Sequence, residues 1–158
     1  MSKVGLESPA VQSYLTILQG VIGRVASNSA AAKTWCVALV SAIIVVVADK
    51  REPDLVWVSL LPVGLFFFLD AYYLGLERQF RQRYNDFIAK LHDGKAEVND
   101  VFIVTPGAGL TESMKAAFQA FGSVSVWPFY SVLAVMLFAV RIWLLANMGG
   151  GGSASLHE

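Results

Sequence analysis

The chain has 158 residues, the size of one ordinary domain, and its 12 basic and 12 acidic residues leave it without net charge. Hydrophobic residues make up 56% of it and charged residues only 15%, whereas about a quarter of the residues in a soluble domain are charged. The balanced charge gives no reason to expect a nucleic-acid partner, and the apolar composition favours a protein of the lipid bilayer.

The first predicted element is an amphipathic helix within residues 1–28. Ser8 and Pro9 form a strong helix start, because a capping side chain precedes a proline in the first helical turn. Apolar residues then recur at steps of three and four as far as Val25, with polar residues on the other faces.

Three long apolar stretches follow, at residues 30–48, 55–76 and 126–146. Each approaches the roughly 20 residues with which a helix crosses a bilayer. The polar residues 49–54 separate the first two stretches and predict a tight turn between antiparallel helices. The sequence therefore predicts an all-α membrane protein with three transmembrane helices, a hairpin over 29–76 and a third span over 123–148.

Between the spans, residues 77–122 are expected to form a cytoplasmic helical segment. Apolar residues keep the helical spacing beyond the second span, so the second helix is predicted to run on until Asp93 and Gly94. Residues 101–104 can pair as an edge strand or form an ordered loop, and we favour the loop. Thr111 can cap one more helix. We expect residues 149–158, which begin GGGGS, to be a flexible linker and tail appended to the protein.

The distribution of basic residues predicts the orientation in the membrane. The turn of the hairpin contains only Lys50 and Arg51, whereas the segments on either side of the hairpin contain more basic residues. The positive-inside rule then places the N-terminus and residues 77–122 in the cytoplasm. The third span would carry the C-terminus outward and leave Arg141 near the outer surface, where its side chain can reach the headgroups.

No catalytic or metal-binding set of residues is apparent. Without the tail, the chain has one histidine, His92, and one cysteine, Cys36, which lies in an apolar run. These residues and the scattered carboxylates offer no nucleophile–base pair and no metal cluster. We therefore expect no enzyme activity, no cofactor and no metal.

Asp70 is the one charged residue in the second apolar stretch. Reflection through the turn places it level with Lys33, and an unpaired aspartate at the centre of a membrane helix costs about 2.5–3.5 kcal/mol on insertion scales. The first interpretation is therefore a structural pair of Lys33 and Asp70. The alternatives are a ring of Asp70 side chains that lines a cation pathway in an oligomer, or local hydrogen bonding alone.

Arg78, Arg81 and Arg83 follow the second span, next to Tyr84. They can form a basic collar that attracts anionic headgroups. They can also form an anion site shared between copies, in which arginine forks bind a phosphate and Tyr84 provides a stacking surface.

Three stretches carry a resemblance to a known group of proteins: LQGVIGRVASNSAAAKTW (18–35), LDAYYLGLERQFRQRY (69–84) and SVSVWPFYSVL (123–133). In these, the chain resembles small multi-helix bacterial membrane effectors of anti-phage defence systems, of the 2TM and SLATT-like pore-forming kind. The resemblance implies a homo-oligomer in the bacterial inner membrane that permeabilises or depolarises it. It also implies control by a nucleotide or oligonucleotide messenger, or by a nucleotide-signalling partner protein.

The predicted function is therefore a gated pore or ion channel. Since the spans are apolar, Phe66, Phe67 and Phe68 are candidates for a constriction that closes by dewetting. The alternative is a non-conducting membrane anchor or scaffold that recruits a cytoplasmic partner through Phe80, Tyr84, Phe87 and the basic face.

Overall fold

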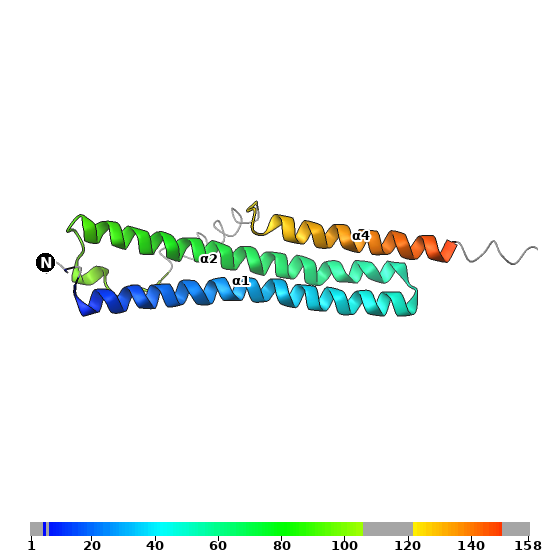
Figure 1. Cartoon of the computed structure of the whole chain (residues 1–158), viewed down its shortest axis with the longest axis horizontal. Helices are drawn as coiled ribbons and strands as arrows, with labels where there is room; N and C mark the ends of the chain where they lie inside the picture. The colour runs from blue at the N-terminus through cyan, green and yellow to red at the C-terminus, as the bar shows by residue number, and fades with distance from the viewer. Residues whose placement is uncertain (1–4, 6, 106–121, 150–158) are drawn as a thin grey trace, which may run out of the picture. The chain divides into compact units, whose positions relative to one another are not determined.

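The structure is a computed structural model that describes Gly5 and residues 7–105 and 122–149. In chain order the described elements are α1 (Pro9–Lys50), η1 (Pro53–Ser59), α2 (Leu60–His92), η2 (Val98–Asp100) and α4 (Trp127–Gly149) (Figure 1). Most of these residues are helical, Glu97 forms an isolated bridge, and none of them forms a strand. The helix expected from Thr111 falls outside the described part of the chain.

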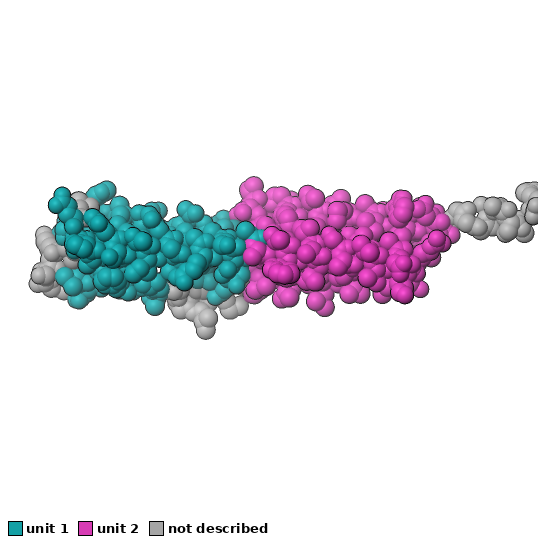
Figure 2. All heavy atoms as spheres, turned by 60° about the horizontal axis from the view of Figure 1, so that its bottom comes forward, with its two compact units in different colours: residues 1–30, 70–120 teal, residues 31–69, 121–158 magenta. Residues whose placement is uncertain are grey.

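Three of the helical stretches are long and apolar enough to cross a membrane: Pro9–Lys50, Pro53–His92 and Trp127–Met148. This confirms the expected all-helical architecture and the number of membrane-length helices. The chain divides into two compact units, residues 1–30 with 70–120, and residues 31–69 with 121–158 (Figure 2). Each unit is described by itself below.

Helix α1 is one uninterrupted helix of 42 residues, which joins the expected amphipathic helix to the first apolar stretch. It begins at Pro9, as the sequence predicts, and the Ser8 carbonyl accepts hydrogen bonds from the first free N–H groups. Its buried residues recur at helical spacing on one face, because only that face contacts the rest of the chain. They are Val11, Tyr14, Leu18, Ser29, Ala32, Cys36, Val40 and Val47.

The turn after α1 combines a left-handed residue with a 3-10 helix. Arg51 has a φ of 52°, which reverses the chain, and Pro53 then starts the seven residues of η1. The second apolar stretch therefore begins as a 3-10 helix and becomes α-helical at Leu60.

In the first unit, α1 and α2 pack together through an aromatic and aliphatic core. The Tyr14 and Phe87 rings meet edge to face with centroids 4.9 Å apart. The remaining buried members of this core are Val11, Leu18, Phe80, Leu91 and Ala96.

The segment after α2 returns along this core. Helix α2 ends at His92, as predicted, and Gly94 takes a φ of 66°, while Lys95 N donates to the Lys90 carbonyl over 2.9 Å. This is the left-handed glycine cap that commonly ends helices. Residues 101–105 are irregular, as expected, and the Tyr14 hydroxyl fastens them by donating to the Ile103 carbonyl over 2.9 Å.

In the second unit, α4 packs antiparallel to η1 and α2. The Tyr130 hydroxyl donates to the Phe66 carbonyl over 3.0 Å, and the Phe138 ring meets the Trp57 ring with centroids 6.2 Å apart. Near the other end, Arg141 donates to Asp54 over 3.2 Å. Later residues of α4 contact earlier residues of η1 and α2, which together form the second arm of the hairpin. Helix α4 therefore runs antiparallel to this second arm.

The core of the first unit should be sensitive to truncation of Phe87, which is only 4% exposed. We expect Phe87→Ala to lower the free energy of unfolding in detergent by about 3–5 kcal/mol, because it leaves a cavity between α1 and α2. The matched control is Gln82→Ala, an exposed position on the same helix. Equal effects of the two substitutions in chemical denaturation would contradict this packing.

Candidate functional site

Asp70 lies on α2 in the first unit and is 0% exposed. Its Oδ1 accepts a hydrogen bond from the hydroxyl of Ser29, which lies on α1 in the same unit. Ser29 is itself buried, with 9% of its surface exposed. The structure thus places a buried carboxylate between two membrane-length helices and shows a hydroxyl donor from the neighbouring helix.

The sequence did not indicate Ser29 as a partner of Asp70, and the geometry of the turn accounts for part of this difference. A 3-10 helix rises about 2.0 Å per residue and an α-helix about 1.5 Å. The seven residues of η1 therefore advance the second arm by roughly 3–4 Å more than α-helical residues would. That is about two residues of α-helix, which is half of the four-residue step from Lys33 back to Ser29. The 3-10 helix therefore accounts for part of the shift toward the start of α1.

Lys33, the partner predicted from the sequence, lies one helical turn after Ser29 on α1 and is half-buried. The Lys33–Asp70 pair stays a prediction. Asp70 is buried, and this matters for the alternative in which Asp70 carboxylates from several copies of the chain line a pathway. Because the side chain is covered within a single chain, such a ring would require α1 and α2 to separate locally.

The four candidates for an anion site have different partners in the structure. Arg81 Nε forms an ion pair with Glu77 one turn earlier, over 2.7 Å. Arg83 donates to the Thr105 carbonyl over 2.8 Å, and the Tyr84 hydroxyl accepts from Gln19 Nε2 over 3.1 Å. Arg78 is exposed on the same helix. An anion that bound all three arginines would therefore compete with the Glu77 carboxylate and the Thr105 carbonyl.

Several of these contacts hold residues 95–105 against the helices of the first unit. Lys90 donates to Asp100 over 2.7 Å, and this hydrogen bond, with one from Glu97 N, holds the pKa of the Asp100 carboxyl below its usual value. A lowered folded-state pKa stabilises the folded form at every pH above the pKa of the unfolded chain. That stabilisation is lost as the pH falls through the lower, folded-state pKa, so the contact persists at neutral pH.

The three phenylalanines of the proposed constriction differ in their surroundings within the second unit. The Phe66 carbonyl accepts from Tyr130, and the Phe67 ring meets the Tyr130 ring edge to face with centroids 5.2 Å apart. Phe68 is 44% exposed. Phe66 and Phe67 therefore both contact α4, and Phe68 is the most exposed of the three.

The described residues contain no group of three or more His, Cys, Asp or Glu side chains that could hold a metal ion. The chemistry that they do bring together is hydrogen bonding and charge pairing inside an apolar helical frame.

Removal of the Ser29 hydroxyl tests the buried pair. We expect Ser29→Ala to lower the free energy of unfolding by about 1–3 kcal/mol, because the buried Asp70 carboxylate loses a donor. Ser27→Ala is the matched control, since Ser27 is exposed on the same helix. Thermal unfolding of both variants in the same detergent measures the difference, and equal stabilities would show that the hydrogen bond contributes nothing.

Comparisons with protein-family models, with curated proteins and with solved structures find no match to this chain. The resemblance to bacterial membrane effectors therefore has only the three quoted stretches behind it and stays a hypothesis. The function is argued below from the residues of the chain itself.

Proposed function

We propose that the chain is an integral membrane protein that assembles into a homo-oligomeric gated pore in the bacterial inner membrane. Its surface supports membrane insertion. Only 22%, 33% and 22% of the most apolar windows of the three long helices are buried within the chain. Large apolar side chains such as Leu61, Val45 and Val135 are 67–73% exposed. Lipid or other copies of the chain can cover this surface without the cost that water imposes.

The observation that carries the proposed assembly is the outward face of α1. Ala31, Thr34, Ala38 and Ala42 are all exposed. At 100° per residue they lie within a sector of about 80°, opposite the buried face of the helix. Small side chains let helix backbones approach closely in lipid, and hydroxyl groups can hydrogen-bond across the contact. We assign this face to the contact between neighbouring copies.

The same helix continues this pattern at Gly20 and Gly23, where the space beside each glycine is open for 4 Å. Ala32, another small residue of α1, is 5% exposed and contributes to the contacts inside the chain instead.

Two features support a pore over a passive anchor. Asp70 is an ionisable group on a membrane-length helix, and such groups commonly mark ion or substrate pathways. Phe68 offers an exposed aromatic ring for an apolar constriction. By contrast, the scaffold alternative relies on Phe80 and Phe87, which are only 5% and 4% exposed and serve the core of the first unit.

On this proposal the N-terminus and residues 77–122 face the cytoplasm, the turn at Lys50 and Arg51 faces outward, and α4 carries the C-terminus outward. The opening signal would be a nucleotide or oligonucleotide messenger, or a nucleotide-signalling partner protein. Arg78, Arg81, Arg83 and Tyr84 stay the candidates for binding it.

The orientation is tested by labelling single cysteines in intact cells with a membrane-impermeant reagent. Lys50→Cys should be labelled from outside and Lys95→Cys only after lysis, because the two positions lie on opposite sides of the membrane in this topology. Cys36 is 0% exposed and should give little background. Labelling of Lys95→Cys in intact cells, or a C-terminal reporter active in the cytoplasm, would refute the proposed orientation.

The pore is tested by replacing a small residue on the outward face of α1 with a larger one. We expect Ala38→Leu to reduce the oligomer at least several-fold and to abolish dye release from liposomes, because the larger side chain separates the packed helices. Val37→Leu is the matched control, being the next residue and also exposed. Native mass spectrometry in detergent and a dye-release assay measure the two effects. A wild-type protein that is only monomeric, or that releases no dye under any signal, would defeat the proposal.

A further inference from the structure

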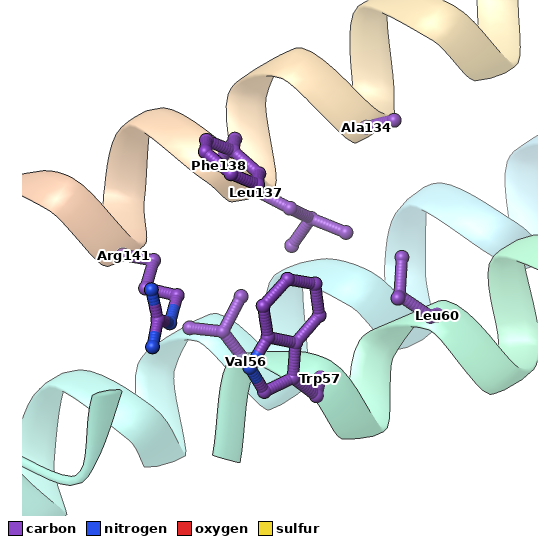
Figure 3. A pocket seen from close by; sticks show the side chains of 7 residues that line it. All are labelled: Val56, Trp57, Leu60, Ala134, Leu137, Phe138 and Arg141. Carbon is purple, nitrogen blue, oxygen red and sulfur yellow. The ribbon is translucent and has the colours of Figure 1, made fainter. Parts of the chain in front are cut away.

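An apolar pocket lies in the second unit between the start of the second arm and α4. It is lined by Val56, Trp57, Leu60, Ala134, Leu137, Phe138 and Arg141. Arg141 lies at one end of the pocket, and Leu60 and Ala134 lie at the other (Figure 3). The site therefore has a charged end and an apolar end.

The volume of the pocket excludes one class of ligand. The volume of the pocket is about 80 Å³, whereas pockets that enclose small-molecule ligands have volumes of roughly 300 Å³ or more. A soluble nucleotide or drug-sized molecule does not fit inside. A hydrocarbon chain that lies along the surface needs only a shallow apolar groove of this kind, since lipid covers its other side.

The guanidinium of Arg141 has unused hydrogen-bonding capacity. It stacks over the Trp57 ring, 5.3 Å from the centroid, and one terminal nitrogen donates to Asp54 over 3.2 Å. Its Nε is buried and has no hydrogen-bond partner among the described residues, so a ligand from outside would bind the terminal nitrogens. Arginine presents five N–H donors that suit the oxygens of a phosphate, and the Arg141 side chain is 27% exposed.

Asp54 adds an exposed negative charge beside this positive one. Its side chain is 82% exposed, so the carboxylate keeps room for a second cationic partner. A ligand that complements the site therefore carries a phosphate for Arg141, a neighbouring cation with N–H groups for Asp54, and a hydrocarbon chain for the groove.

We propose that this pocket binds a phospholipid whose headgroup carries a primary ammonium, as in phosphatidylethanolamine. The phosphate binds Arg141, the ammonium binds Asp54, and an acyl chain lies along Trp57, Leu60 and Ala134. The inference rests on the membrane placement proposed above, in which Arg141 and Asp54 lie near the outer surface. Tryptophan is enriched at that depth of a membrane, which agrees with the position of Trp57.

The test is lipid binding to the purified, delipidated full chain in detergent, measured by native mass spectrometry. Phosphatidylethanolamine, phosphatidylcholine and phosphatidylglycerol with identical acyl chains are the three probes. We expect half-saturation by phosphatidylethanolamine at about tenfold lower concentration, because phosphatidylcholine has no N–H donor for Asp54 and phosphatidylglycerol has no cation. Equal binding of the three lipids would overturn the proposal.

Substitutions then separate the two halves of the headgroup. Arg141→Gln should weaken binding of all three lipids, because all share the phosphate. Asp54→Asn should remove the preference for phosphatidylethanolamine while phosphatidylglycerol binds at least as well as before. Arg51→Gln, an exposed arginine of the turn outside the pocket, is the matched control and should change nothing. If Arg141→Gln does not fold, the lipid preference of Asp54→Asn tests the proposal by itself, because the Asp54 side chain is mostly exposed and its substitution should not disturb folding.

A second copy of the chain is the other occupant that the test distinguishes. Ala134→Leu fills the apolar end of the pocket and should reduce lipid binding while the oligomer persists. Loss of the oligomer with unchanged lipid binding would show that a second copy covers the pocket and would overturn the proposal. Because bound lipid is the readout, a chain that binds phosphatidylethanolamine but conducts nothing would refute the pore and leave this inference intact.

Discussion

The structure depends on the single buried face of α1. One helix of 42 residues presents apolar and small side chains to the rest of the chain on one side only, at helical spacing. The helices satisfy their own backbone hydrogen bonds, so they need little internal core, and the remaining apolar surface is left for the surroundings.

Against this apolar background, three polar side chains make contacts that join neighbouring helical elements. Ser29 donates to the buried carboxylate of Asp70, and Tyr130 donates to a backbone carbonyl of the neighbouring helix. Arg141 combines an ion pair to Asp54 with a contact to the Trp57 ring. Each pairing joins two helical elements, so the polar contacts also select which faces meet. This is the expected use of polar groups where hydrophobic packing alone gives little specificity.

Polar contacts have different positions in the two units. In the first unit, Arg83 donates to the Thr105 carbonyl and Tyr14 donates to the Ile103 carbonyl, and both hydrogen bonds hold an irregular segment against the helices. In the second unit, Arg141 of α4 pairs with Asp54 at the start of η1, and Tyr130 donates to the Phe66 carbonyl of α2.

The sequence by itself determined the helices and many of their ends, because local chemistry decides these. Ser8–Pro9 and Gly94 are start and stop signals that act within one turn, and the apolar runs are long enough to span a bilayer whatever surrounds them. The unusual position of Asp70 was also visible. Only the tertiary structure decided that Ser29 is a donor to Asp70, because the register between α1 and α2 depends on the geometry of the turn that joins them. The pocket at Arg141 was also visible only in the tertiary structure, because Trp57 and Phe138 lie far apart in sequence and meet only when α4 packs against η1.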